Sequence, residues 1–338
     1  MNINMKTIWK IIIIAIAAGL ALAIIGFTLG ASRSLYLDRT GVHIAGSETT
    51  HIIEHDLASF RNIDIDAGFS DVEFVSANAY GIEISSDIAE LDWSLENDTL
   101  TISLVRSSRV QIFNFNFSSR DRNNIRVFIP NDAVFDTVTV KASSGDVRIG
   151  DIRATSVEVN ITSGDIRLND ISSDYLHVSS TSGNITSSAI DTKDFIHNIR
   201  SGNGRLQTIN AERFSAELTS GDLSITEGEF TAVSITGQSG NITVNDITSQ
   251  STNVQLTSGD IRLSGDFSGE TVAQARSGNV SVSTSGERND YSFDLSVTSG
   301  TVRLDGERLR GGITSNPALE NHINITTTSG NITVSFTG

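Results

Sequence analysis

Eight glycines between residues 145 and 278 recur at intervals of 19 residues, each in the tripeptide Ser-Gly-Asp or Ser-Gly-Asn. Two further Ser-Gly pairs follow after intervals of 22 and 30 residues. A fixed period of this length indicates a repeat architecture, in which one structural unit stacks on the next. The ten glycines are Gly145, Gly164, Gly183, Gly202, Gly221, Gly240, Gly259, Gly278, Gly300 and Gly330.

Apolar and polar residues alternate on both sides of each glycine. In one copy the apolar residues are Val157, Val159 and Ile161 before the glycine and Ile166 after it, and Ile171 marks a corner. Alternation with a period of two predicts β-strands. Because no copy can bury its apolar side alone, we predict an all-β fold. It is a single-stranded β-solenoid (parallel β-helix-like) with 19-residue coils about 4.8 Å apart.

The Ser-Gly-Asp/Asn tripeptide has the composition of a tight turn. Glycine adopts positive φ without steric cost, and Ser, Asp and Asn side chains can hydrogen-bond the backbone groups that a turn exposes. We therefore assign the ten glycines a structural role as turn residues.

The N-terminal region contains a run of apolar residues, from residue 11 to residue 29, that includes no charged side chain. A helix of 19 residues rises about 28 Å and nearly spans a hydrocarbon core of about 30 Å. Lys6 and Lys10 precede it and favour an N-terminus on the inner side. We predict a retained membrane anchor over residues 1–33, with one transmembrane helix and an extracytoplasmic C-terminal β domain. A cleaved signal peptide is the alternative.

The β region divides into an irregular part and a regular part. Residues 34–137 are predicted to form an irregular β cap and starting coils, in which residues 62–66 and 71–75 alternate as a strand pair around Gly68. Residues 138–338 are predicted to form the regular solenoid. Its last coil, from residue 323 onward, would leave an open edge, so we expect a capping insertion at about 305–322 to cover the end.

These features resemble a bacterial "putative adhesin" domain family of unknown function, which includes LiaG-like membrane-anchored proteins of cell-envelope stress operons. The matching residues are Ile63-Asp64-Ile65, Gly68, Asp71-Val72-Glu73, the entry Ile129-Pro130 and the repeated Ser-Gly-Asp/Asn units. The similarity covers roughly residues 50–338 and the motifs carry no catalytic residues. The resemblance implies a surface β-solenoid and leaves its ligand open.

The histidines offer one motif for metal chemistry. The segment from His51 to His55, with Glu54, fits the H-x-x-E-H pattern of zinc peptidases, which requires a helix. The segment is short and runs directly into a predicted strand, so we interpret the match as fortuitous. His197 falls at an inward position of the repeat and is predicted to be a core or turn-facing residue.

Carboxylates recur directly after the turn glycines, and arginines follow two residues later. The residues of this predicted surface ladder are Asp146, Arg148, Asp165, Arg167, Asp260 and Arg262. Carboxylates about 5 Å apart in adjacent coils could bind Ca²⁺ or act in glycan cleavage. The arginines and the Asn residues of intervening coils would relieve the repulsion between carboxylates, which favours a solvated ladder over a metal or catalytic site.

The chain has 338 residues, a formal net charge of −16 and no cysteine. The absence of cysteine excludes disulfides, thiolate metal sites and cysteine nucleophiles. The negative charge disfavours binding to nucleic acid and to anionic lipid surfaces. No cofactor and no metal site is predicted.

We therefore predict a non-enzymatic, membrane-anchored, cell-surface β-solenoid. It would act as an adhesin-like binding scaffold or as a cell-envelope stress or signalling accessory protein, with a cell-envelope protein or glycan as partner and the membrane contacted through residues 11–29. The alternative is a glycan-processing enzyme, a polysaccharide lyase or hydrolase that uses Asp clusters. An enzyme would interrupt the repeat with a cleft, and the irregular interval between Gly278 and Gly330 is the place to look for one.

Overall fold

The computed structural model describes residues 34–38, 41–45, 50–86, 91–104, 110–114, 123–309, 312–315 and 319–337, together with residues 16 and 19. The chain divides into two compact units, one of Met1–Thr49 and Arg106–Arg122, the other of Thr50–Val105 and Asn123–Gly338. In the first unit, β1 (Ser34–Asp38) pairs antiparallel with both β2 (Gly41–Ala45) and β9 (Val110–Asn114).

The predicted anchor at residues 11–29 lies outside the described residues, apart from residues 16 and 19, which are both helical. Within the described part of the chain, no helix combines the length and the apolar character needed to cross a bilayer.

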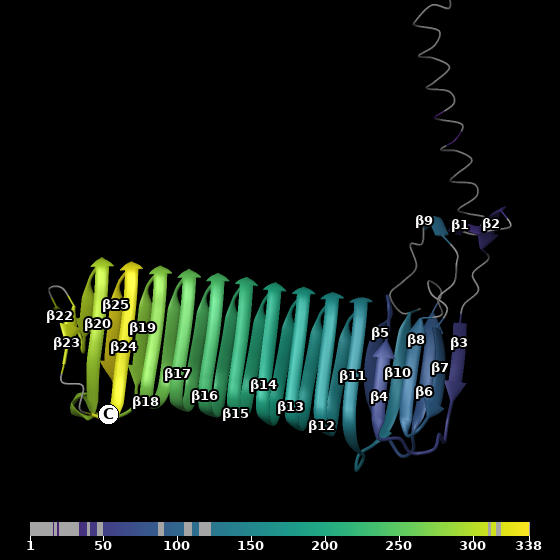
Figure 1. Ribbon diagram of the computed structural model, residues 1–338, viewed down its shortest axis with the longest axis horizontal. Helices are drawn as coiled ribbons and strands as arrows, with labels where there is room; N and C mark the ends of the chain where they lie inside the picture. The colour runs from purple at the N-terminus through teal and green to yellow at the C-terminus, as the bar shows by residue number, and fades with distance from the viewer. Residues whose placement is uncertain are drawn as a thin grey trace, which may run out of the picture. The chain divides into compact units, whose positions relative to one another are not determined.

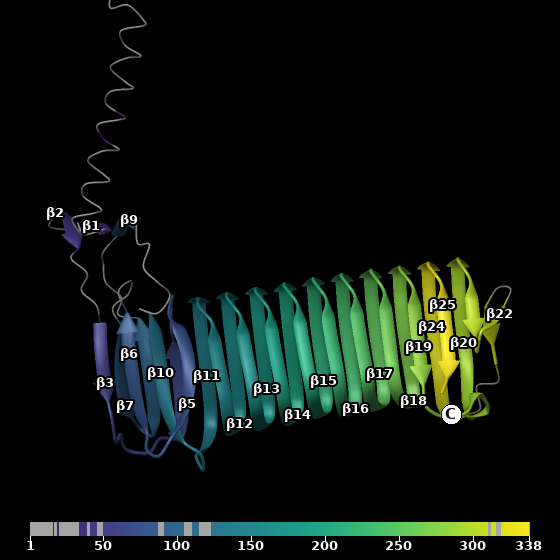
Figure 2. The same cartoon turned by 180° about the vertical axis from the view of Figure 1, so that it is seen from behind.

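The second unit is a β-solenoid, which confirms the predicted all-β fold and 19-residue coil (Figure 1). Each regular strand has 17 residues and pairs in parallel with the next, so that residues 19 apart, such as Val159 and Val178, are partners. The one exception among these strands is the corner after Val244, where the register shifts by one residue and Ile247 pairs with Gly265. These strands are β12 (Val147–Ser163), β13 (Ile166–Ser182), β14 (Ile185–Ser201), β15 (Gly204–Ser220), β16 (Leu223–Ser239), β17 (Ile242–Ser258) and β18 (Ile261–Ser277). Figure 2 shows the same stack from behind.

Each coil bends at a corner that the repeat pattern only partly predicts. In strands β12 to β17 the sixth residue after the turn glycine adopts a left-handed conformation, as Asp151 (φ 57°) and Glu227 (φ 62°) do, although none of these residues is glycine. The isoleucine that follows, such as Ile152, is buried and anchors the corner. In these coils one left-handed residue turns the chain, and the parallel pairing resumes directly after it.

The interior is one continuous core in which apolar side chains stack in columns from coil to coil. Phe195 and Phe214, which are in-register partners in adjacent coils, have ring centroids 5.3 Å apart. Of the two positions predicted for His197, the core is the one observed: the side chain is fully buried in the same interior, and its ring stands edge-on to Phe195. Because each coil contributes equivalent inward positions, burial is shared between neighbours and no coil is stable alone.

At the N-terminal end of the solenoid, β4 (Asn62–Asp66) and β5 (Asp71–Ala77) form one coil around Gly68. The predicted pairing of these two strands with each other is wrong. Toward the regular coils, β4 pairs with β11 (Val134–Ser144) and β5 pairs with β12. Toward the end of the solenoid, β4 pairs with β8 (Thr99–Leu104) and β5 pairs with β10 (Asn124–Pro130). A strand and its continuation after the turn lie on opposite sides of the core, so their hydrogen bonds go to neighbouring coils.

Three antiparallel strands complete this end. β6 (Gly81–Ser86) pairs with β10 and with β3 (Thr50–Glu54), and β7 (Leu91–Glu96) pairs with β8. The pairing leaves short, irregular edges in place of the open edge of a regular coil.

At the C-terminal end the coils do not follow the order of the chain. β24 (Asn321–Ser329) lies between β18 and β20 (Tyr291–Ser299), and β25 (Ile332–Phe336) lies between β19 (Val280–Thr284) and β21 (Val302–Leu304). The expectation that the last coil of the chain occupies the open end is therefore wrong, because the preceding coil is the outermost one.

Two short strands from the interval after β21 lie along the outer edge of this outermost coil. β22 (Glu307–Leu309) pairs antiparallel with β21, and β23 (Ile313–Thr314) pairs antiparallel with β20. They contact the edge opposite to the one that β24 and β25 occupy.

Candidate functional site

The turn glycines form a column in which each approaches the next very closely. A Cβ on Gly221 would overlap the carbonyl oxygen of Gly202, and the same holds between neighbouring glycines throughout the column. Their φ values lie between 122° and 152°. Glycine is required here because of this close stacking as well as because of its backbone conformation.

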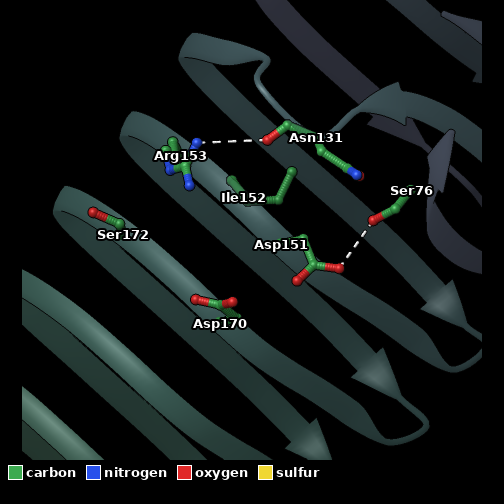
Figure 3. A pocket seen from close by; sticks show the side chains of 7 residues that line it. All are labelled: Ser76, Asn131, Asp151, Ile152, Arg153, Asp170 and Ser172. Atoms are coloured by element: carbon green, nitrogen blue, oxygen red, sulfur yellow. Dashed lines mark hydrogen bonds between the residues drawn. The ribbon is translucent and has the colours of Figure 1, made fainter. Parts of the chain in front are cut away.

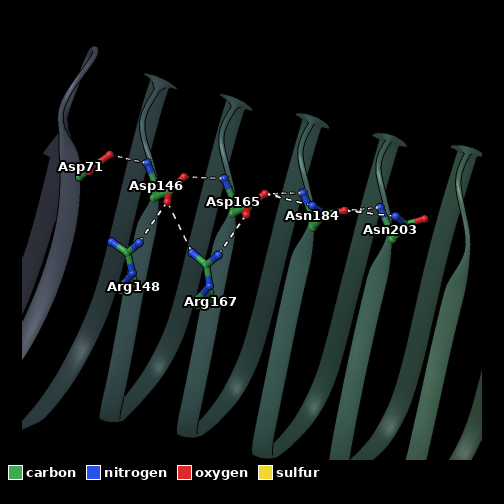
Figure 4. A network of polar contacts seen from close by, with 7 residues as sticks. All are labelled: Asp71, Asp146, Arg148, Asp165, Arg167, Asn184 and Asn203. Carbon is green, nitrogen blue, oxygen red and sulfur yellow. Dashed lines mark hydrogen bonds and ion pairs between the residues drawn. The ribbon is translucent and has the colours of Figure 1, made fainter. Parts of the chain in front are cut away.

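The residue after each glycine forms a continuous hydrogen-bonded ladder along the same edge of the solenoid (Figure 4). The Oδ1 atom of Asp146 accepts a hydrogen bond from the backbone N–H of Asp165 at 3.0 Å, and Asp165 accepts from Asn184 in the same way at 3.0 Å. The ladder begins at Asp71, which accepts from Asp146, and ends at Thr301. Between Asn184 and Thr301 its rungs are Asn203, Asp222, Asn241, Asp260, Asn279 and Asn331.

The second polar atom of the side chain has different partners on Asp and Asn rungs. The amide nitrogen of Asn184 donates to Asp165 at 3.3 Å. An aspartate has no such donor, and the Oδ2 atoms of Asp146 and Asp165 instead accept from Arg148 and Arg167, each at 3.1 Å. Arg167 also reaches Asp146 at 3.5 Å.

The six residues of the predicted surface ladder therefore fall into two groups. Asp146, Arg148, Asp165 and Arg167 form one network, whereas Asp260 and Arg262, 2.7 Å apart, form a separate pair five coils further along. The backbone N–H of Asn279, and then the charge of Arg262, lower the pKa of Asp260. The carboxylates are held as acceptors for the next coil and for arginine, and no group of three acids or histidines suited to a metal occurs in the described ranges.

The H-x-x-E-H segment has the wrong secondary structure for zinc chemistry. His51 and Glu54 lie in strand β3, which pairs with β6, and His55 follows the end of that strand. In an extended chain, residues four apart are separated by about 13 Å, which is too far for two ligands of one zinc ion.

A shallow polar groove of about 340 Å³ lies at the left-handed corner near the N-terminal end of the regular coils (Figure 3). Ser76 donates to Asp151 at 2.9 Å, and Arg153 donates to the carbonyl oxygen of Asn131 at 3.5 Å. The carboxylate of Asp170 has no partner within the described part of the chain. The lining residues are Ser76, Asn131, Asp151, Ile152, Arg153, Asp170 and Ser172.

A second groove, of about 480 Å³, lies at the equivalent corner near the other end of the array. Asp246 lines it at the repeat position that Asp151 holds in the first groove, five coils or about 24 Å away at 4.8 Å per coil. The sequence analysis missed both grooves. The recurring Asp six residues after the turn glycine was the available signal, but it does not by itself indicate a left-handed corner.

The uninterrupted coils and internally paired ladder define a class of protein, the elongated β-solenoid built from Ser-Gly-Asp/Asn turns. Within that class, the chain belongs to the Toastrack DUF4097 family, which it matches over residues 60–195 and 174–335. No curated protein matches it in sequence.

The solved structures to which this chain is similar include three from the genera Bacteroides and Parabacteroides. The "putative adhesin" from Bacteroides fragilis is 14% identical, with 86% of this chain and 98% of that chain covered and a TM-score of 0.39. One from Parabacteroides distasonis is 13% identical, with coverages of 86% and 98% and a TM-score of 0.36. One from Parabacteroides merdae is 14% identical, with coverages of 87% and 98% and a TM-score of 0.36.

Proposed function

We propose that this protein is a non-enzymatic binding scaffold displayed on the outer face of the cell membrane. The observation that carries the proposal is the use of the ladder carboxylates. Asp146 and Asp165 each accept a backbone N–H of the next coil and an arginine N–H, so the paired acids hold coils together and are not free to act as acid and base.

The membrane attachment belongs to the same proposal. The apolar run at residues 11–29 would be a retained single-pass anchor, with the solenoid outside the cell and a cell-envelope protein or glycan as its ligand. Such a protein would serve in adhesion or as an accessory to envelope-stress signalling. Digestion of intact cells with a protease should remove the β domain while leaving a membrane-bound fragment, and protection of the β domain would contradict this orientation.

The two corner grooves are the sites at which we expect the scaffold to contact its ligand. They lie at equivalent corners, and their hydroxyl and carboxylate groups can hydrogen-bond a glycan or a polar protein surface. Retention of the purified β domain on isolated cell envelopes should fall in the Asp151→Asn/Asp170→Asn variant. Asp222→Asn, which removes one charge from the turn ladder, provides a control and should bind like wild type.

The absence of catalysis is tested by the Asp146→Asn/Asp165→Asn variant. Asparagine already occupies equivalent rungs at Asn184 and Asn203, so the ladder should be preserved. We expect neither wild type nor variant to release products from cell-wall or capsule polysaccharides. Turnover by wild type that is lost in the variant would overturn the scaffold proposal and favour a glycan-processing enzyme.

A further inference from the structure

The coil formed by β24 and β25 is the last part of the chain, yet it lies between two coils that precede it. β24 has β18 on one side and β20 on the other, while β25 has β19 and β21. In the regular array each coil can be laid on the edge that its predecessor leaves open. The C-terminal coil instead has two neighbours that are both synthesised before it.

The β20–β21 coil, which precedes the C-terminal coil in the chain, has the same alternation of apolar and polar residues. It could therefore pair with the edge of β18–β19 that the C-terminal coil occupies. Val280 and Val302 both pair with Ile332, one from each side, and all three are fully buried. Ser277 and Ser299 likewise both pair with Ser329. The β20–β21 coil therefore presents to β18–β19 the pattern that the C-terminal coil presents in the native structure.

We propose that β20–β21 first pairs directly with β18–β19 during folding. The two coils then separate, and the C-terminal coil inserts between them and pairs with both. The first arrangement keeps the order of the chain and uses the coil that is made earlier. The second arrangement is the native one. The solenoid thus completes its C-terminal end by inserting a coil, whereas its body grows by addition.

The rung at Thr301 favours the inserted order. In the native ladder Asn279 accepts from the N–H of Asn331 at 3.0 Å, and Asn331 accepts from the N–H of Thr301 at 3.1 Å. Thr301 is then the last rung and has no further coil to bind. In the order of the chain, Thr301 would be an interior rung without an Oδ1 atom, and the N–H of Asn331 would lose its acceptor.

The short strands β22 and β23 favour the inserted order as well. They pair with β21 and β20 on the edge opposite to the C-terminal coil. If the coils followed the order of the chain, the C-terminal coil would occupy that edge and both short strands would lose their partners. Insertion allows the outermost coil to be paired on both sides.

Asn321 holds the start of the inserted coil to both neighbours. Its Oδ1 atom accepts from the N–H of Gly269 at 2.9 Å, and its carbonyl oxygen accepts from the hydroxyl of Ser292 at 3.2 Å. The same hydroxyl lies 2.8 Å from Nδ1 of His322. The contact with Gly269 forms only when the coil lies next to β18, so it stabilises the inserted state specifically.

Cysteine pairs can distinguish the two orders, because the chain contains no cysteine of its own. Thr333 pairs with Ser281 on one side and with Arg303 on the other. Adjacent strands are about 4.8 Å apart, which a disulfide can bridge, whereas Ser281 and Arg303 are separated by about 9.6 Å, beyond the limit of about 7 Å. In the native full-length protein we expect Ser281→Cys/Thr333→Cys to cross-link and Ser281→Cys/Arg303→Cys not to.

During refolding from urea, brief pulses of oxidant should cross-link Ser281→Cys/Arg303→Cys at early times, with a yield that falls as the native state forms. The matched control is Ser224→Cys/Arg262→Cys, which is also two coils apart, with Thr243 between the two residues in register. An early cross-linking yield at least fivefold above this control supports the proposed insertion of the C-terminal coil. A yield equal to the control at every refolding time would overturn the proposal.

A substitution at the last rung provides an independent test. Thr301→Asn supplies the missing Oδ1 acceptor to the early arrangement, in which β20–β21 stacks directly on β18–β19. It should increase the early Ser281→Cys/Arg303→Cys yield and prolong its decay by at least twofold. An unchanged yield and decay would contradict the role assigned to Thr301.

Discussion

His197 should make the solenoid sensitive to acid. Its ring is fully buried among apolar residues, and neither ring nitrogen has a hydrogen-bond partner within the described structure. Its in-register neighbours, Val178 and Ala216, carry no charge, and a Cβ at Gly204 would lie 2.6 Å from Nε2 and 2.7 Å from the flexible end of Leu223. Gly204 therefore provides the space that the ring occupies, and burial lowers the pKa of His197 to about 3.

The sign and size of the effect follow from the difference between the folded and unfolded states. The unfolded chain binds a proton on this histidine below its ordinary pKa of 6.5, whereas the folded chain does not until about pH 3. The contribution to stability is thus complete above pH 6.5 and is lost as the pH falls, by about 1.4 kcal/mol per pH unit. Between pH 8 and pH 5 the expected loss is about 2 kcal/mol.

The control is the His197→Val/Gly204→Ile variant, which copies Val178 and Ile185 of the preceding coil. Urea unfolding followed by circular dichroism at pH 8 and pH 5 gives the stability loss for each protein, and the difference between them isolates His197 from the other titrating groups. Because solenoid coils can open locally, hydrogen exchange in β14 should show the same difference. Equal pH dependence in the two proteins would refute the reasoning.

Three further outcomes are expected. Gly221→Ala should lower the free energy of unfolding by more than about 4 kcal/mol or prevent folding, because its Cβ would overlap a carbonyl oxygen. Gly306→Ala, at φ 79° with open space around it, should lower it by about 1 kcal/mol. Equal urea midpoints for the two variants would contradict this. Asp222→Ala should lose about 0.5–1.5 kcal/mol because water replaces the carboxylate that accepts the N–H of Asn241 in this exposed hydrogen bond, and Asp222→Asn should be near neutral, as measured by thermal unfolding. Zinc should not raise the melting temperature of wild type more than that of a His51→Ala/His55→Ala variant. A larger rise in wild type would indicate that these histidines bind zinc.

The regular part of the fold could be predicted closely from the chain. The spacing of the turn glycines and the alternation of residues such as Val157 and Val159 determine which residues become partners, because equivalent positions in identical coils must stack to bury their apolar side chains. The same pattern placed His197 in the interior. The candidate site was predictable only in part, because the repeat indicates which carboxylates share a column but not which N–H groups they bind.

The tertiary structure alone decided the order of the coils at the C-terminal end and the shape of the corners. Coils that share one pattern are interchangeable by local sequence, so the position of the Gly330 coil between those of Gly278 and Gly300 depends on pairing along whole edges. The left-handed corner at Asp151 depends likewise on the strands that it joins, since an aspartate does not by itself require that conformation. Local periodicity therefore determined the coil itself, and long-range strand pairing determined how the last coils are arranged.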